Sequence, residues 1–339
     1  MKILNGISAV SSQSTYDLTK ALREKGYNAT AVIYKSNHLL GSKCDFNLNI
    51  NKGKIYMMPV YAMRVLMFFI LALLKYDIFH FHFGHSLLPF NLDLPILKLL
   101  GKKVFMEYHG SDIRRPSVFK EKNKFAYSIN QEIEKKSFLK QRRISRYVDG
   151  IIVHDHELKE HLFDFGVKIH ILPLRIDLTN YKVSLPKVQN ETICIVHAPS
   201  KKEIKGSNII IETVEELKEF YNIDFKLVYN MPHEKALRIY QKADLIIDQL
   251  RIGSYGMLSI EAMAMGKPVI CYLREDLISL FPCIPPIINA NETNLKEKIE
   301  FLIKNPDIRQ SLGIQSRKYV EEYHDSIKVA EKCIEIYCT

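Results

Sequence analysis

The sequence predicts an α/β protein built from two doubly wound, parallel-sheet domains in tandem. Short apolar runs alternate with amphipathic stretches of about 10–15 residues, the pattern of parallel strands joined by crossover helices. The length of 339 residues corresponds to about two domains. The alternation is interrupted once, at Ile171–Val183, where Pro173 and mixed polarity favour a linker. After this segment the alternation starts again.

The first half of the chain is predicted to form one doubly wound sheet. Gly26 and Gly101 follow two of its helices and are typical helix ends, because glycine readily takes the left-handed conformation. The predicted strands are Lys2–Leu4, Ala29–Tyr34, Ile78–Phe81, Lys103–Tyr108 and Gly150–His154. The predicted helices are Tyr16–Lys25, Met63–Leu74, Leu92–Leu100 and Gln131–Arg146.

The second half repeats this organisation. The predicted strands are Thr192–His197, Phe225–Tyr229, Leu245–Gln249 and Pro268–Tyr272. The predicted helices are Ser207–Phe220, Glu234–Lys242, Met257–Met265, Leu295–Ile303 and Asp307–Tyr323, with a last helix to about Ile336. We therefore expect domains at 1–172 and 187–322, a linker at 173–186 and a C-terminal helix at 323–339. Ligands of such sheets bind beyond the carboxyl ends of the strands, so the expected site is the cleft between the domains.

Composition excludes several classes of protein. With 47% apolar and 25% charged residues, the chain is not a disordered, collagen-like or disulfide-scaffold protein. None of the six cysteines shows C-x-x-C spacing, which disfavours zinc and redox sites and favours reduced thiols in a cytoplasmic protein. The start, MKILNGISAVSSQS, has no apolar segment of the signal-peptide type. The apolar run Val65–Leu74 is too short to span a bilayer and is expected to form a buried helix.

The net charge of +10 is concentrated in the first half of the chain. Residues 1–172 contain 26 basic and 15 acidic residues, and the segment Lys98–Arg146 contains 14 and 5. Two interpretations remain open for this segment: a solvated helix face, or docking to an anionic membrane surface at which Phe119 and Phe125 add apolar contact. No nucleic-acid recognition motif is present, so no nucleic-acid partner is expected.

Two motifs in the second half favour anion and ribose binding. In HAPSKKEIKG, Lys201, Lys202 and Lys205 precede a helix N-terminus, where a bound phosphate would offset their unfavourable position; the alternative is a solvated basic loop. In Asp248–Pro268, Glu261 lies on an otherwise apolar helix, where an unpaired carboxylate is unfavourable. A ribose diol that donates hydrogen bonds to this carboxylate would offset that cost. The alternative is a partly exposed glutamate stabilised by the helix dipole.

A third motif, EYHGSDIRR at Glu107–Arg115, follows a first-half strand. His109, with Gly110 beside it, could hydrogen-bond a sugar hydroxyl or take up a proton. The alternative is a histidine at a strand end whose hydrogen bonds are all made within the protein. The segment HFHFGH contains three more histidines, but no carboxylate or cysteine lies nearby at a telling spacing, so no metal site is expected.

Together these stretches resemble the retaining nucleotide-sugar glycosyltransferases of family 4, which have the GT-B fold of two facing Rossmann-like domains. The resemblance rests on HFHFG with VFMEYHGSDIR, GIIVHDHELKEHL with IHILPLRIDLTNY, HAPSKKEIKGS and, most specifically, YGMLSIEAMAMGKPVICY. It implies transfer from a nucleoside-diphosphate sugar to a glycan or lipid-linked acceptor with retention, in cell-envelope or surface polysaccharide synthesis. It also implies that no metal or other cofactor is needed, and that the C-terminal helix packs back on the first domain.

The resemblance also implies roles for single residues. Lys205 would contact the diphosphate, Glu261 the ribose, and His109 would sit by the reacting sugar, so His109 and Lys205 are the expected catalytic residues. Backbone amides of Met257 and Leu258 would cradle phosphate. The expected donor site further includes Ser200, Lys201, Lys202, Gly206, Gly253, Tyr255 and Gly256.

The sequence departs from the family pattern at two places. Gly253 stands where the family has the first carboxylate of E-x7-E, and Asp248 is a candidate substitute. Ser200 or Pro199 stands where the family often has an arginine, so Lys201 or Lys202 is a candidate source of that charge. The alternative functions are a nucleotide-sugar epimerase of the same fold and a non-catalytic sugar-nucleotide-binding subunit. G-x-G-x-x-G and P-loop motifs are missing from the sequence, which disfavours dinucleotide and P-loop enzymes.

Overall fold

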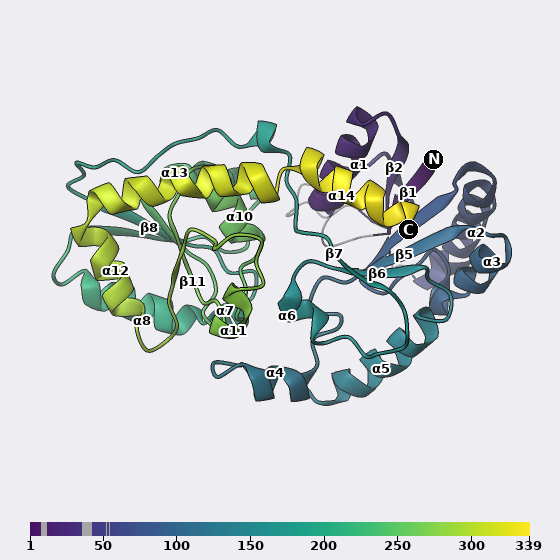
Figure 1. Ribbon diagram of the computed structural model, residues 1–339, viewed down its shortest axis with the longest axis horizontal. Coiled ribbons are helices and arrows are strands. Elements are labelled where there is room, and N and C mark those ends of the chain that lie inside the picture. Colours follow the sequence, from purple (N-terminus) through teal and green to yellow (C-terminus); the bar gives the residue numbers. More distant parts are fainter. Residues whose placement is uncertain (8–11, 36–42, 52, 54) are drawn as a thin grey trace. The chain divides into compact units, whose positions relative to one another are not determined.

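The computed structural model describes residues 1–7, 12–35, 43–51, 53 and 55–339. The chain forms two compact units. Unit 1 comprises Met1–Val118, Asn130–Arg175 and Ser326–Thr339, and unit 2 comprises Phe119–Ile129 and Ile176–Asp325. Each unit contains its own parallel sheet with helices on both faces (Figure 1), which confirms the predicted two-domain α/β class.

The sheet of unit 1 has seven strands in the order β3-β2-β1-β4-β5-β6-β7, all parallel. The strands are β1 (Lys2–Gly6), β2 (Asn28–Ile33), β3 (Phe46–Asn47), β4 (Ile78–His82), β5 (Lys103–Glu107), β6 (Gly150–Val153) and β7 (Ile169–Ile171). The strand order reverses between β1 and β4, so this is the topological switch point at which such sheets bind ligands. In the β4–β5 register His82 lies opposite Glu107, at the carboxyl ends of both strands.

Two helical layers cover this sheet. The helices are α1 (Ser12–Glu24), α2 (Met58–Lys75), α3 (Asp93–Leu99), α5 (Glu132–Ile144), α6 (His156–Lys159) and α14 (Ser326–Cys338), with 3-10 turns η1 (Ile55–Met57) and η2 (Pro89–Asn91). Helix α4 (Pro116–Lys122) crosses from unit 1 into unit 2. Helices α1 and α14 pack side by side and share one apolar core (Figure 1), and α2, α3 and α5 contribute to the core on the other face.

Unit 2 has a five-stranded parallel sheet in the order β12-β11-β10-β8-β9. Its strands are β8 (Ile193–His197), β9 (Ile223–Leu227), β10 (Leu245–Ile247), β11 (Val269–Cys271) and β12 (Ile287–Asn289). Its helices are α7 (Lys202–Lys205), α8 (Ser207–Leu217), α9 (His233–Tyr240), α10 (Met257–Ala264), α11 (Glu275–Ile278), α12 (Leu295–Lys304) and α13 (Pro306–Tyr323), with the turn η3 (Leu178–Asn180). Here the order reverses between β8 and β10, which places the segments after these two strands at the switch point.

The structure corrects three expectations. The helix expected at Ser207–Phe220 is preceded by the separate short helix α7, because Gly206 takes the left-handed conformation with φ 74°. The strand β7 (Ile169–Ile171), which was not predicted, occupies the start of the segment Ile171–Val183 where the alternation was expected to be interrupted. The apolar run Val65–Leu74 is not buried: α2 is 18 residues long, and of these only Tyr61, Val65, Phe69 and Ala72 are buried. The chain passes between the units at residues 118, 129, 175 and 325.

Candidate functional site

In unit 2 a buried ion pair joins the end of β10 to α7. Asp248 directly follows β10 and is fully buried, and its Oδ1 accepts a hydrogen bond from Lys205 Nζ at 2.7 Å. Lys205 Nζ also donates to Gln249 Oε1. Burial alone would raise the pKa of Asp248, but the Lys205 ammonium and its hydrogen bonds lower it, so the carboxylate is charged. Lys205 is thus held in place at the switch point with its side chain 12% exposed.

The start of α10 lies against the same carboxylate. Asp248 Oδ2 accepts from Ser259 Oγ at 2.7 Å and from the backbone N–H of Gly256 at 3.4 Å. Within the part of the chain that the structure describes, the backbone N–H groups of Met257 and Leu258 have no acceptor. Unbonded N–H groups and the positive end of the dipole make a helix start suitable for an anion. Lys205 and the start of α10 therefore flank one place where a phosphate can bind.

Glu261 lies one turn further along α10 and is 8% exposed. Its Oε1 accepts from Tyr181 Oη at 3.2 Å and lies 2.7 Å from His233 Nε2, at the start of α9. Both contacts are to Oε1, and Oε2 has no partner among the described residues. The sequence predicted Glu261 but missed Tyr181 and His233, which carry no local motif.

At Gly253 the structure leaves no room for the carboxylate expected from the resemblance. Gly253 has φ +90°, and a Cβ atom there would lie 2.7 Å from Cγ of Arg274. Arg274 is 3% exposed, and its guanidinium donates to Asp276 at 2.5 and 3.1 Å. Because the Arg274 side chain fills this space, a glutamate at position 253 would collide with it. Asp248, the candidate substitute, is engaged by Lys205 and Ser259.

The remaining predicted donor residues of unit 2 fall into two groups. Ser200, Lys201 and Lys202 are exposed, and Lys202 Nζ lies 5.0 Å from the centre of the Tyr229 ring. Tyr255 instead holds the last part of unit 2, because its hydroxyl lies 3.0 Å from both Tyr319 Oη and His324 Nε2. The structure therefore places Gly256, Met257, Leu258 and Glu261 along α10, links Lys205 to the start of that helix through Asp248, and leaves Lys201 and Lys202 at the surface.

In unit 1 a buried carboxylate gathers charged and aromatic side chains at the carboxyl ends of the strands. Arg175 donates to both oxygens of Glu107, at 2.6 and 2.9 Å, and both side chains are fully buried. His80 Nε2 lies 2.9 Å from Glu107 Oε2, and His82 and His154 each lie 3.4 Å from a Glu107 oxygen. Burial alone would raise the pKa of Glu107, but Arg175 holds it well below the usual range.

Hydrogen bonds connect His82, His109 and His154 in a chain that begins at Asn5. The amide nitrogen of Asn5 donates to two oxygens of α1, so its Oδ1 accepts from His82 Nε2 at 2.8 Å. Neutral His82 then accepts at Nδ1 from His109 Nε2, at 3.0 Å. His109 Nδ1 in turn accepts from His154 Nε2, at 2.8 Å. Both ring nitrogens of His109 are therefore occupied, and burial and the neighbouring imidazoles hold its pKa well below 6.5.

The loop that carries His109 is itself fixed. Asp112 Oδ1 accepts from the backbone N–H groups of His109 and Gly110, at 3.0 and 2.8 Å. Gly110 has φ +123°, a conformation that favours glycine. The His109 ring also stacks on Phe83, with ring centres 4.0 Å apart. His109 is consequently a positioned, neutral and partly exposed group at the switch point of unit 1.

The same cluster contains two groups with the composition of metal sites. His80, His82 and Glu107, and likewise Glu107, His109 and His154, have ligand atoms within 4.8 Å of one another. The sequence missed this carboxylate because Glu107 reaches the histidines only through the β4–β5 register. Arg175 already occupies both oxygens of Glu107, so a cation would have to displace the guanidinium.

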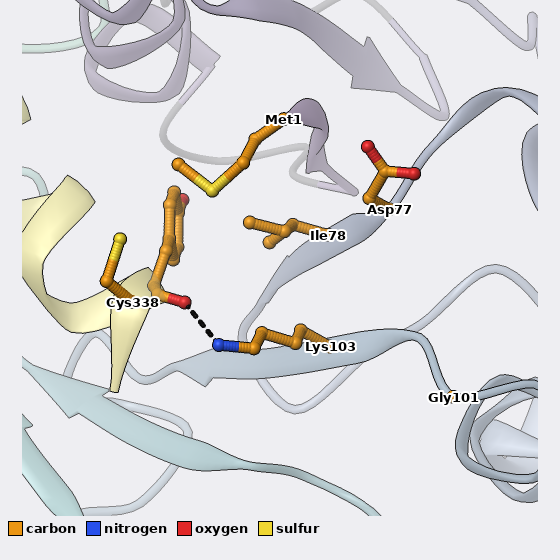
Figure 2. A pocket seen from close by; sticks show the side chains of 7 residues that line it. Met1, Asp77, Ile78, Gly101, Lys103 and Cys338 are labelled. Atoms are coloured by element: carbon orange, nitrogen blue, oxygen red, sulfur yellow. Dashed lines mark hydrogen bonds between the residues drawn. The ribbon is translucent and has the colours of Figure 1, made fainter.

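A hollow of about 400 Å³ lies at the opposite edge of this sheet. It is lined by Met1, Asp77, Ile78, Gly101, Lys103, Tyr337 and Cys338. Figure 2 shows Lys103 reaching across it to the carbonyl oxygen of Tyr337, at 2.8 Å. Because it lies at the amino ends of β4 and β5, it is remote from the edge at which such sheets bind ligands.

Comparison with known proteins gives two family matches. Residues 11–180 match the model described as Glycosyltransferase Family 4, and residues 206–335 match one described as glycosyl transferase-like. No curated protein matches the chain.

Solved structures share the fold over 82–100% of the chain. Sucrose-phosphate synthase from Thermosynechococcus elongatus is 15% identical with a TM-score of 0.69, over 99% of this chain and 98% of that one. Anabaena HepE in complex with UDP and glucose is 14% identical with a TM-score of 0.67, over 100% of both chains. An S. aureus TarM mutant in complex with fondaparinux, alpha-GlcNAc-glycerol and UDP is 14% identical with a TM-score of 0.57, over 82% of this chain and 59% of that one. These likenesses identify the architecture as GT-B.

Proposed function

Because the chain belongs to glycosyltransferase family 4, we propose that it transfers a sugar from a nucleoside-diphosphate sugar to a glycan or lipid-linked acceptor. We propose retention of anomeric configuration, no required metal, and a role in cell-envelope or surface polysaccharide synthesis. The expected location is the cytoplasm, at the inner face of a membrane. The complexes of HepE with UDP and of TarM with UDP and a glycan support the classes of donor and acceptor.

The arrangement along α10 is the observation that carries this proposal. The N–H groups of Met257 and Leu258 and the ammonium of Lys205 offer positive charge at one end of the helix. Glu261 offers a free carboxylate oxygen four residues further, about 6 Å along the axis at 1.5 Å per residue. A diphosphate and its attached ribose present an anion and a diol at a comparable separation. The site therefore fits a nucleoside diphosphate.

The proposed mechanism depends on the negative charge that develops on the diphosphate leaving group during transfer. Breaking the anomeric bond leaves an oxocarbenium-like sugar and adds negative charge to the diphosphate. Lys205 and the α10 amides would stabilise that charge, and preorganised donors of this kind are usually the largest catalytic contribution. Asp248 would hold the Lys205 ammonium in position before the donor binds. His109 is neutral, and both of its ring nitrogens are hydrogen-bonded. It would therefore act as a polar group of fixed orientation beside the sugar rather than as a proton donor.

A non-catalytic sugar-nucleotide-binding subunit is the second candidate. It is favoured by one observation: Arg274 fills the space beside Gly253 where the family has a carboxylate for the donor sugar. Such a protein would bind the nucleotide through Lys205 and Glu261 and transfer no sugar.

Two measurements separate these candidates. Thermal shifts with UDP-, GDP- and ADP-sugars should identify a donor, since a ligand that binds only the folded state raises the melting temperature. Turnover of that donor with an added acceptor, followed by NMR of the product, then tests transfer and retention. Binding without turnover supports the binding subunit, an epimer formed without acceptor supports an epimerase, and an inverted product refutes retention. Failure of every nucleotide to bind would refute the proposed donor site.

A further inference from the structure

Unit 1 exposes an apolar surface on helix α2 that its own fold does not use. One side of α2 is buried in the sheet core through Tyr61, Val65, Phe69 and Ala72. The opposite side, at the same helical spacing, carries large apolar side chains that are 45–82% exposed: Met63, Leu66, Met67, Ile70, Leu71 and Leu74. A helix that is apolar all round is normally covered on all sides. Something outside unit 1 is therefore expected to contact this side of α2.

Helix α3 extends the exposed surface. Leu94 and Leu97 of α3 enter the same core as α2, while Ile96 and Leu99 point away from it and are 40% and 86% exposed. Both helices cover one face of the sheet, so their outer sides face the same way (Figure 1). Their ends are tied together, because Lys102 Nζ donates to Tyr76 O at 2.8 Å. We call this surface, formed by the exposed residues of α2 together with Ile96 and Leu99, the α2–α3 face.

The exposed charges that belong to α2 and α3 themselves have one sign. Within 55–76 and 90–103, all of which the structure describes, the sole acidic residue is Asp93, and it is fully buried. Arg64 and Lys75 of α2 are exposed, Lys98 lies on α3, and Lys102 lies between α3 and β5. Lys98 is paired with Asp149 at 2.7 Å and Arg64 donates to Leu48 O at 2.9 Å, which leaves Lys75 as the more available cation. An apolar strip on helices whose own exposed charges are basic complements a lipid surface with anionic headgroups.

We infer that the α2–α3 face docks unit 1 onto an anionic phospholipid membrane, with α2 lying in the plane of the interface. A second copy of the chain fits less well, because a symmetric contact would bring the cations of both copies together without an acidic partner. Helix α2 is long and apolar enough to cross a membrane by length and composition. Crossing would, however, remove Val65 and Phe69 from the sheet core, so the helix lies on the membrane instead.

This inference relocates the membrane contact expected from the sequence. Phe119 is 2% exposed, and Phe125 packs edge-on against Tyr272 with ring centres 5.1 Å apart. Neither is placed to enter a lipid layer. In the segment Lys98–Arg146 several cations are paired, as Arg114 is with Glu157 at 2.6 Å. The two phenylalanines expected to add apolar contact thus do not supply it, whereas the exposed residues of α2 do.

The absence of tryptophan from the chain permits a direct test. Leu71→Trp, at a site 62% exposed, places a single fluorophore on the α2–α3 face, and Phe220→Trp, at a site 70% exposed in unit 2, is the matched control. With phosphatidylcholine vesicles containing phosphatidylglycerol, the emission of the first variant should shift to the blue and be quenched by brominated acyl chains. The emission of the control should not change. Equal behaviour of both variants would overturn the inference.

Co-sedimentation measures the energetic contribution of the same face. Leu66→Gln/Ile70→Gln/Leu74→Gln should lower the bound fraction at least about tenfold, and Phe220→Gln/Leu280→Gln/Ile284→Gln should leave it unchanged. Binding should weaken in about 1 M salt, where the Debye length is about 3 Å. Equal binding to neutral vesicles would refute the anionic partner. A dimer seen by light scattering that the first triple variant dissociates, without vesicle binding, would assign the face to a second copy. Thermal unfolding checks that both triple variants fold, and the tryptophan readout is independent of them.

Discussion

Arg175 holds both oxygens of Glu107, at 2.6 and 2.9 Å, in the fully buried centre of unit 1. The two residues lie 68 positions apart, Glu107 at the end of β5 and Arg175 at the end of the segment that follows β7. Three histidines contact the same carboxylate. This ion pair therefore supports the cluster that orients His109, and its loss should affect both stability and the site.

We expect Glu107→Gln and Arg175→Met each to lower the free energy of unfolding by about 3–5 kcal/mol, because each leaves a buried charge without its partner. The double variant should lose clearly less than the sum of the two, since no charge is then left unpaired. Urea unfolding of the four proteins measures this coupling. Strictly additive losses would show that the pair contributes no specific interaction.

The histidine cluster should make stability fall in mild acid. Burial lowers the pKa of His154 to about 4, while an unfolded histidine titrates near 6.5. Between these values the unfolded chain binds a proton that the folded chain does not, so stability is complete above about pH 6.5 and is lost as the pH falls toward about 4. This single group accounts for about 3 kcal/mol, and His82 and His109, with pKa values also lowered by burial, act in the same direction. Urea midpoints of His154→Gln should depend less on pH than those of the wild type, with exposed His85→Gln as control. An unchanged slope in His154→Gln would contradict this assignment.

Lys205 should be separable into a structural and a catalytic contribution. Lys205→Ala should lower kcat/KM about 10²–10³-fold, the scale of losing one strong charge stabiliser. It should also destabilise unit 2, because the buried Asp248 loses its cation. Adding Asp248→Asn should recover the melting temperature but not the activity. Recovery of activity as well, or a loss below about threefold, would reject Lys205 as a phosphate ligand.

Glu261 should act on nucleotide affinity. Glu261→Gln should weaken binding of the nucleoside diphosphate about 10-fold or more, since a hydrogen bond to a charged acceptor contributes about 1.5–3 kcal/mol. His233→Ala should weaken it less, because His233 only orients the carboxylate through Oε1. Exposed Glu234→Gln on the same helix as His233 is the control for isothermal titration. Unchanged affinity of Glu261→Gln would remove the ribose role.

Local sequence motifs predict some residues of the candidate site, but not those that meet only in the folded protein. Lys205, Glu261 and the start of α10 lie in contiguous stretches where a strand, a loop and a helix succeed one another, so their grouping is predictable. His233 is 28 residues from Glu261, and Arg175 is 68 from Glu107, so only the folded sheet brings them together. The fold class followed from alternation, but the exposure of α2 did not, because an apolar run has the same appearance whether one side or both sides are buried.

Substitution of Gly253 tests whether Arg274 occupies the space that a carboxylate at this position would need. Gly253→Ala places a Cβ atom 2.7 Å from Cγ of Arg274 and also puts a side chain at φ +90°, so we expect a loss of about 1–3 kcal/mol in stability. Gly26→Ala is the matched control, because its φ of +86° carries the same backbone cost with no atom within 4 Å of the new Cβ. The difference between the two variants therefore measures the overlap with Arg274. Adding Arg274→Ala to Gly253→Ala should remove that difference in thermal unfolding. If Gly253→Ala costs no more than Gly26→Ala, the space beside Gly253 is open and a carboxylate there is compatible with the fold.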